Sequence, residues 1–365
     1  MDFDEKKYWL WLSFVPQMWY DKAKKYMRVF ETPKAIYEAN EETLEKTGIF
    51  SKEDIYNIVN AKRNINIEEK YNEMVRKGIN FVTVEEDSYI DKLRIYEDKP
   101  LWLFYKGVLP KNEDKLVGMV GARNCSQYGK TMAESIAGKL ALYSIGVVSG
   151  LARGIDVAAH RGAIEGGGRT YAVLGCGVDI CYPRENINTY MEIISNGAVI
   201  SEYPPGCEPM AWQFPYRNRI ISMLSDSVAV MEAKRKSGSL ITTDYALKYG
   251  KDVFALPGRV NDVLSEGCND LIKSGALMVT EAEDMLFSVG VYFDEKDRRK
   301  NKKKKILLEK ENEVVYSCLD LLPKGIEEII DKTGMNSSEI YEALMSLMLN
   351  GLIIEPVKNH YARKI

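Results

Sequence analysis

Two short loops combine glycine with arginine, and each follows an apolar run that predicts a β-strand. The first is Gly121-Ala-Arg123, directly after Val117–Val120, and the second is Ser149-Gly-Leu-Ala-Arg153. Glycine lets backbone N–H groups approach an anion, and the start of the helix that follows adds partial positive charge. The two arginines add fixed charge. The loops therefore predict a site that holds phosphate.

The common nucleotide fingerprints do not describe this site. Neither loop has the spacing G-x-G-x-x-G, and G-x-x-x-x-G-K-[ST] occurs nowhere in the 365 residues. Those spacings place glycines and a lysine around a dinucleotide or a nucleoside triphosphate. We therefore expect a phosphate chain of another kind.

Further cations follow later apolar runs. Arg184 comes after Gly175-Cys-Gly177 and Tyr182-Pro183, near the expected start of a helix. Arg217, Asn218 and Arg219 follow Pro215 in what we expect to be the first turn of another helix. Cations there oppose the helix dipole, so a ligand that compensates for the cost is favoured. An ion pair with Glu202 or Glu232 is the alternative for one of the arginines.

Several residues that could do chemistry favour structural roles. Ser237–Thr243 offers hydroxyls at a helix start, which cap the helix, bind phosphate, or do both. His160 is expected inside a helix, four residues after Asp156, and is interpreted as structural. Cys176 and Cys181 lie in no recognisable nucleophile motif and are interpreted as packing residues. We predict no catalytic residue, no metal and no cofactor.

Composition limits the function further. Lys and Arg number 50 against 53 Asp and Glu, a net charge of −3, so any nucleic-acid site must be a local patch. Six scattered cysteines without a C-x-x-C pair, and only two histidines, argue against a zinc site or a disulfide scaffold. No basic leader or long apolar run is present. We expect a cytoplasmic protein that does not contact membrane.

The apolar pattern predicts the architecture. Short helices are expected up to about residue 77, where the aromatic residues of Tyr8–Trp11 and Met18–Tyr20 favour a core over base stacking. Strands are expected at 81–84 and 101–105, and then near 117–121, 146–150, 170–175, 198–202, 227–232, 252–256 and 276–279, alternating with helices. This alternation predicts an α/β fold with a doubly wound, mainly parallel sheet, whose ligands bind beyond the carboxyl ends of the strands.

The last third of the chain changes character. Glu295–Lys305 is a charge run that predicts a basic linker, with capture of a polyanion as the alternative. Beyond it, three helical patterns and two short strand-like stretches outline a winged helix. Its last helix carries Ile340, Leu344 and Leu347 on one apolar face. That helix has two glutamates and no Lys or Arg, so a protein contact is favoured over reading of a DNA groove.

These motifs, taken in order, resemble the DNA-processing protein A family (DprA, also called Smf). The series that carries the resemblance is Val120-Gly-Ala-Arg123, Tyr128-Gly129, Ser149–Asp156 with Ala159-His160, Ala172–Gly175, Tyr182-Pro183, Ser201–Gly206, Phe214-Pro215 with Arg217–Ile220, Ser237–Thr242 and Ala255–Gly258. It covers about 170 residues in unbroken order.

The resemblance implies a fold and its boundaries. It implies a helical, SAM-like module at 1–80, an extended Rossmann-like domain at 81–290, a basic linker at 291–308 and a winged-helix module at 309–365. The first module matches only in length and outline, because Val15–Trp19 lacks the glycine turn of a helix-hairpin-helix. No DNA contact is assigned there.

The resemblance also implies a function. It implies a protein without enzymatic activity that binds single-stranded DNA, protects incoming DNA and helps load the RecA recombinase in natural transformation, as a homodimer. The implied DNA-binding residues are Gly121, Arg123, Ser149, Gly150, Arg184, Arg217, Asn218 and Arg219. Ala122 stands where the family often has Ser or Thr, which removes one hydroxyl.

An enzyme on a related sheet is the alternative. Nucleoside-monophosphate phosphoribohydrolases share this outline, but their signature is Pro-Gly-Gly-x-Gly-Thr followed by Glu. This chain has Ser237-Gly-Ser-Leu-Ile-Thr-Thr243 at the corresponding place. The glycine run and the catalytic carboxylate are therefore missing from that position.

Overall fold

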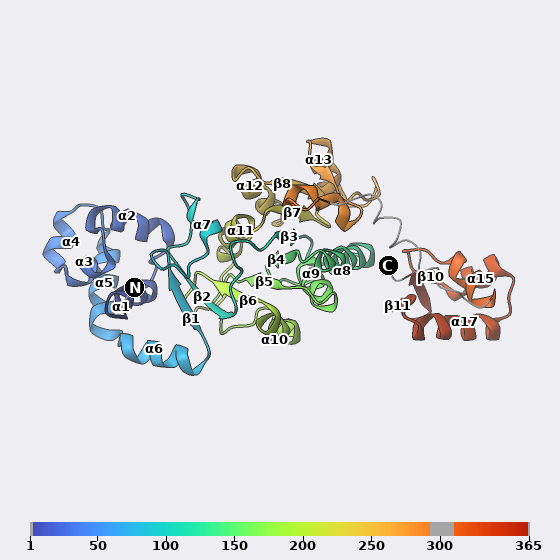
Figure 1. The fold of residues 1–365 in the computed structure, drawn as a ribbon, viewed down its shortest axis with the longest axis horizontal. Helices are drawn as coiled ribbons and strands as arrows, with labels where there is room; N and C mark the ends of the chain where they lie inside the picture. Colours follow the sequence, from blue (N-terminus) through green and yellow to red (C-terminus); the bar gives the residue numbers. More distant parts are fainter. Residues whose placement is uncertain (1–2, 293–309, 364–365) are drawn as a thin grey trace.

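A nine-stranded sheet organises the fold (Figure 1). The computed structural model describes residues 3–292 and 310–363, so the predicted linker at 291–308 lies outside the described residues apart from its first two positions. The strands are β1 (Asn80–Thr83), β2 (Trp102–Gly107), β3 (Leu116–Val120), β4 (Gly146–Ser149), β5 (Thr170–Val173), β6 (Ala198–Ser201), β7 (Ser227–Val230), β8 (Asp252–Ala255) and β9 (Leu277–Met278). Each begins within one residue of its predicted start.

The strand order is β1-β2-β6-β5-β4-β3-β7-β8-β9. Strands β3 to β9 pair in parallel, whereas β2 pairs antiparallel with both β6 and β1. The prediction of a mainly parallel sheet is confirmed. From β3 the chain winds outward through β4, β5 and β6, and then returns to place β7 on the other side of β3. The direction of winding therefore reverses between the neighbouring strands β3 and β7.

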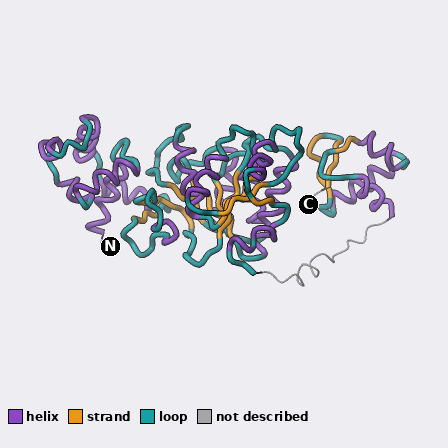
Figure 2. The backbone as a smooth tube through the Cα atoms, turned by 90° about the horizontal axis from the view of Figure 1, so that it is seen from above, coloured by secondary structure: helices purple, strands orange, loops and turns teal. Residues whose placement is uncertain are grey.

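Helices cover both faces of this sheet (Figure 2). They are α7 (Asp91–Arg94), α8 (Gln127–Leu142), α9 (Ile155–Glu165), α10 (Ile187–Asn196), α11 (Gln213–Leu224), α12 (Leu240–Lys248) and α13 (Glu266–Lys273), with short 3₁₀ turns η1 (Arg184–Asn186), η2 (Ala282–Met285) and η3 (Phe287–Val289). Successive side chains of a strand point to opposite faces. Accordingly, Val147 packs with α8 and α9, and Val148 packs with α11 on the other face.

Small residues let α8 and α9 approach each other closely. A Cβ on Gly162 of α9 would lie 2.1 Å from the backbone oxygen of Glu134 in α8. Gly166 likewise approaches the backbone oxygen of Gly138, where a Cβ would lie at 2.6 Å. Glycine at these positions therefore sets the spacing of the helix pair that covers one face of β3 and β4.

His160 lies inside α9, as the sequence predicted, and the structure shows that it is buried. The Thr170 hydroxyl donates to the backbone oxygen of Val147 at 3.0 Å, so it accepts from Nδ1 of His160 at 2.6 Å. Nε2 then carries no proton, and it has no partner within the described ranges. Burial, together with the charge of Arg217, lowers the pKa of His160 to about 3.

Six helices precede the sheet: α1 (Phe3–Phe14), α2 (Tyr20–Phe30), α3 (Pro33–Glu38), α4 (Glu41–Lys46), α5 (Lys52–Asn64) and α6 (Ile67–Arg76). Trp9, Trp11 and Met18 are at most 3 % exposed, which confirms the prediction that they form a core. That core is continuous with the sheet, because the rings of Trp9 and Trp102 lie 6.4 Å apart. The helices are therefore packed against β1 and β2.

The described residues after the linker form a second group of elements. They are α15 (Lys310–Cys318), β10 (Lys324–Gly325), α16 (Ile326–Thr333), α17 (Ser337–Leu349), β11 (Ile353–Val357) and β12 (His360–Arg363), with the antiparallel order β10-β12-β11. Ile340, Leu344 and Leu347 of α17 are buried, as predicted. The order of helices and strands fits a winged helix, and that assignment stays a prediction. None of the described helices is both long and apolar enough to cross a bilayer.

The close contact of α8 and α9 predicts that Gly162→Ala destabilises the protein. The added methyl group meets backbone, which cannot rotate away, so we expect a loss of about 1–3 kcal/mol in the free energy of unfolding. Gly238→Ala is the control, because a Cβ there has no atom within 4 Å. Urea unfolding measures both variants, and equal midpoints would contradict the packing argument.

The environment of His160 predicts a pH dependence of stability. Its pKa is lower in the folded than in the unfolded chain, so the unfolded chain binds a proton first as the pH falls below about 6.5. Between pH 7 and pH 5 this lowers the free energy of unfolding by about 2 kcal/mol. His160→Gln should lose less stability over that range in urea titrations. The same loss in both proteins would show that His160 does not cause it.

Candidate nucleic-acid interface

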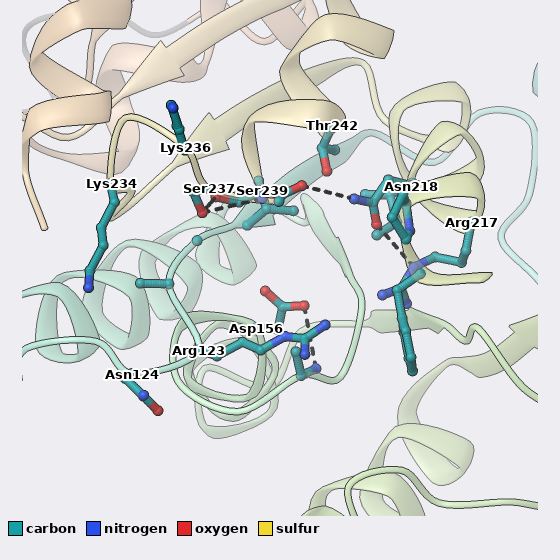
Figure 3. Close-up of a pocket in the computed structure, with 18 of the residues that line it drawn as sticks. Arg123, Asn124, Asp156, Arg217, Asn218, Lys234, Lys236, Ser237, Ser239 and Thr242 are labelled. Carbon is teal, nitrogen blue, oxygen red and sulfur yellow. Dashed lines mark hydrogen bonds between the residues drawn. The ribbon is translucent and has the colours of Figure 1, made fainter. Parts of the chain in front are cut away.

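A pocket of about 400 Å³ opens at the carboxyl ends of β3 and β7, where the winding of the sheet reverses (Figure 3). Ligands of open parallel sheets bind at this topological position. The loop after β3, the first turns of α11 and the segment between β7 and α12 form its walls. Its charged and hydrogen-bonding side chains are Arg123, Asn124, Asp156, Arg217, Asn218, Lys234, Lys236, Ser237, Ser239 and Thr242.

The charge of the pocket is positive, although the chain as a whole is negative. Two arginines and two lysines line it against one carboxylate, that of Asp156. Burial raises the pKa of Asp156, and the nearby Arg217 opposes this rise. The carboxylate also accepts from the backbone N–H of Gly150 at 3.2 Å. The one acidic side chain that lines the pocket is therefore buried, and it does not neutralise the exposed cations.

Arg217 is both a wall of the pocket and an anchor for the sheet. It is 4 % exposed, and burial lowers its pKa. Its Nη1 donates to the backbone oxygens of Gly150 at 3.0 Å and of Val173, and its Nε donates to Oδ1 of Asn218 at 3.2 Å. For Nη2, the described part of the chain supplies no hydrogen-bond partner. One arm of the guanidinium thus holds β4 and β5 together, and Nη2 of the other lies against Gly150, where a Cβ would be only 2.5 Å away.

Phe214 forms an aromatic platform beside these cations. The guanidinium carbons of Arg123 and Arg217 lie 5.4 and 6.0 Å from its ring centroid. The ring of Tyr182, which is 44 % exposed, lies 5.5 Å away at an interplanar angle of 31°. A Cβ on Gly175 would lie 3.0 Å from the Phe214 ring, so glycine there leaves it room. Aromatic faces flanked by guanidinium groups suit the stacking of unpaired bases.

The structure brings together four of the predicted site residues. Gly121, Arg123, Arg217 and Asn218 all line the pocket. Arg123 is exposed and forms no ion pair or hydrogen bond with any described residue.

The other four predicted residues do not line it. Ser149 is fully buried and donates to the backbone oxygen of Met119 at 2.5 Å, and Gly150 lies beneath Arg217. Arg184 lies in η1 on the loop after β5, exposed and without an ion pair or hydrogen bond to residues 3–292 or 310–363. Its contact with DNA stays a prediction.

Arg219 lies on another side of α11. Its Nη2 donates to both carboxylate oxygens of Glu202, at 2.6 and 2.8 Å, and its guanidinium lies 4.3 Å from the Tyr216 ring centroid. Burial works against its charge, but Glu202 outweighs this effect and the pKa of Arg219 is raised. The alternative of an ion pair with Glu202 is therefore confirmed for Arg219, and its contact with DNA stays a prediction.

Sequence reasoning missed Phe214, Lys234 and Lys236 as site residues. The signal for the lysines was the run Lys234-Arg235-Lys236, one residue after the predicted strand at 227–232. Arg235, which lies between the two lysines, does not line the pocket and instead forms an ion pair with Asp270 at 2.9 Å. For Phe214 the motif was noted, but the contacts of its ring involve two loops that are far apart in the sequence, those after β3 and after β5.

In the part of the chain that the structure describes, two cysteines lie on the loop after β5. Cys176 is buried, and burial raises its pKa to about 12, so the thiol stays protonated. Cys181 donates weakly to the backbone oxygen of Pro183 at 3.4 Å. Both are placed as packing residues, as predicted. Within the described ranges, no group of three or more His, Cys, Asp and Glu side chains is arranged to hold a metal ion.

Comparison with known proteins gives a consistent picture. The family model described as DNA recombination-mediator protein A matches residues 80–290. The DNA processing protein DprA of Streptococcus pneumoniae is 45% identical over 204 residues, which is 56% of this chain and 72% of that protein.

Two solved structures are also similar. The X-ray structure of the Streptococcus pneumoniae protein has 34% sequence identity and a TM-score of 0.66, and the match covers 79% of this chain and 99% of that one. The second is DNA processing protein A from Helicobacter pylori, a structure described as giving insight into its single-stranded DNA binding mode. It has 30% sequence identity and a TM-score of 0.51. That match covers 57% of this chain and 95% of the other.

The two arginines of the pocket should respond differently to a change to lysine. Arg217→Lys loses the planar group that reaches two backbone oxygens, so we expect a loss of about 1–3 kcal/mol in the free energy of unfolding. Arg123→Lys is the control, and we expect a change within about 0.5 kcal/mol. Thermal unfolding without DNA measures both. Equal stability of the two variants would show that the Arg217 guanidinium does not stabilise the sheet.

Proposed function

The chain belongs to the DNA recombination-mediator protein A family, and on that basis we propose that its pocket binds single-stranded DNA. The observation that carries the proposal is the Phe214 ring with the guanidinium groups of Arg123 and Arg217 within 6.0 Å of its centroid, at the reversal point of the sheet. The Helicobacter pylori relative, with its single-stranded DNA binding mode, supports the same ligand.

The geometry favours a single strand over a duplex. Stacking on Phe214 and Tyr182 requires a base face that is not already stacked and paired. The Arg123 guanidinium offers a planar fork that suits phosphate oxygens. A strand that lays its bases on the aromatic rings brings its backbone within reach of the cations. Sequence preference is expected to be weak, because every base has a stacking face.

Arg184 provides a second phosphate contact in this proposal. It follows Tyr182 by two residues, and the Tyr182 ring contacts Phe214 in the pocket. The guanidinium is exposed and has no intramolecular partner in the part of the chain that the structure describes. A strand stacked on Tyr182 would leave the pocket toward this arginine.

A hydrolase remains the less supported function. Its catalytic carboxylate would have to come from Glu232, at the end of β7, or from Asp156. Glu232 accepts from the backbone N–H of Ser126 at 2.8 Å and from its hydroxyl, so it holds the start of α8. Asp156 is buried under Arg217. The family is one of DNA-processing proteins, and we propose that this member binds DNA without chemical turnover.

The wider role follows from the family. We propose that the protein protects incoming DNA and helps load the RecA recombinase in natural transformation, that it works as a homodimer in the cytoplasm, and that the carboxyl-terminal module contacts a protein. The acidic Glu339 and Glu342 of α17 support the last point, because they would repel phosphate.

The proposal predicts that Arg123→Ala and Arg184→Ala each weaken binding to a single-stranded oligonucleotide. Each lost contact should reduce the log-log salt slope by about 0.7, and different base sequences should be affected alike. Fluorescence anisotropy across salt concentrations measures both quantities. Arg235→Ala is the matched control, because that arginine is exposed, lies between Lys234 and Lys236, and is paired with Asp270.

Two results would count against the proposal. Equal affinity of the wild-type protein for duplex and single strand would remove the stacking argument. A double Arg123→Ala, Arg184→Ala variant with wild-type affinity and slope would place the DNA elsewhere.

A further inference from the structure

The hydroxyl of Thr242 lies in the wall of the pocket without a hydrogen-bond partner. The residue is fully buried, and Oγ1 bonds to no atom of the described chain. In Figure 3 this oxygen points to the side of the pocket where Ser239 and Asn218 lie. A buried polar atom without a partner is costly, and proteins keep few of them. The missing partner is therefore a reason to expect a ligand at this point.

The neighbouring residue shows the usual arrangement. Thr243 donates its hydroxyl to the backbone oxygen of Leu240 at 2.6 Å, within α12. The corresponding bond is not formed by the Thr242 hydroxyl. The backbone of Thr242 is held in place, because Ser222 of α11 donates its hydroxyl to the Thr242 oxygen at 2.7 Å. Its backbone is thus fixed at the wall of the pocket.

Further groups around this hydroxyl suit an anion. Ser237 and Ser239 lie at the start of α12, with their hydroxyls 2.8 Å apart, and both line the pocket. The start of the helix adds partial positive charge. Lys234 and Lys236 are exposed, and neither pairs with an acidic residue in the described ranges. We call Lys234, Lys236, Ser237, Ser239 and Thr242 the α12 site.

We propose that the α12 site binds a phosphodiester of the DNA strand, with the Thr242 hydroxyl donating to it directly or through one water molecule. The inference rests on the proposed single-strand function and locates a phosphate contact on the wall of the pocket that α12 forms. The serine hydroxyls and the α12 start hold the phosphate oxygens, and the lysines neutralise its charge.

Asn218 keeps the two halves of the pocket at a fixed separation. Its Oδ1 accepts from Nε of Arg217 at 3.2 Å, and its Nδ2 donates to the backbone oxygen of Gly238 at 3.3 Å. The aromatic half, with Phe214, and the α12 site are therefore linked by one side chain. A base on Phe214 and a phosphate at α12 would belong to nearby positions of the same strand.

The test compares two adjacent substitutions of similar shape. Thr242→Val removes the hydroxyl without a partner, and Thr243→Val removes the hydroxyl that is bonded within the helix. We expect Thr242→Val to bind a thymidine oligonucleotide about tenfold more weakly, while its Tm without DNA stays equal or rises. Thr243→Val should keep wild-type affinity and lose Tm. The reverse pattern, or equal affinity of all three proteins, would overturn the inference.

A second measurement separates phosphate from base contacts. Oligonucleotides with neutral methylphosphonate linkages lack the charge that the site recognises. If the wild-type protein loses affinity for them and Thr242→Val loses little more, the hydroxyl acts on phosphate. If Thr242→Val weakens neutral and charged strands by the same factor, the hydroxyl contacts a base and the inference fails.

Three outcomes show which proposal is at fault. Inorganic phosphate that displaces the oligonucleotide at equal concentration would make the α12 site a free-phosphate site and would overturn the assignment to a strand. If Arg123→Ala weakens strand binding but Thr242→Val does not, the proposed function stands and only the α12 site is wrong. Absence of any strand binding by the wild-type protein would remove both.

Discussion

The arrangement at the end of the sheet depends on the buried guanidinium of Arg217. Burial of an arginine is costly unless hydrogen bonds and an opposite charge accompany it. The backbone oxygens of Gly150 and Val173 supply the first, and Asp156 supplies the second. This cluster joins the start of α11 to β4, β5 and α9. It also requires glycine at position 150, where a Cβ would lie 2.5 Å from Nη2 of Arg217 and 2.7 Å from Oδ2 of Asp156. The loops of the pocket are built on this base.

Ion pairing decides which cations are left for a ligand. Three arginines near the strand ends are paired within the chain: Arg153 with Glu185, Arg219 with Glu202 and Arg235 with Asp270. Arg123 and Arg184 have no such partner in the described residues, although they lie on the same loops or adjacent ones. A chain of net negative charge can therefore present a positive pocket, because its acidic side chains are placed beside other cations. The total charge carries no information about this selection.

The sheet was predictable because its strands are buried apolar runs bounded by glycine and polar residues, a pattern that needs no tertiary information. The glycine loop with Arg123 was predictable for the same reason, since it follows such a run directly. The burial of individual polar residues could not be predicted from the sequence. Ser149 follows the same pattern as Arg123, yet its hydroxyl is used inside the sheet. Arg217 and Arg219 differ by two positions in one helix, and this spacing turns one toward the pocket and the other toward Glu202.

The amino-terminal helices contact the segment that leads into α11, and this contact links them to the pocket. Trp19 packs against Trp212 and Tyr203, with ring centroids 5.0 and 5.5 Å apart. Trp212 is the residue directly before α11 and stands two positions before Phe214. The residue that leads into α11 therefore packs against the amino-terminal module. Because Phe214 and Arg217 both lie in the first turns of that helix, the position of the aromatic platform depends on a contact that the amino-terminal module makes. The module thus contributes to the geometry of the pocket by positioning the start of α11.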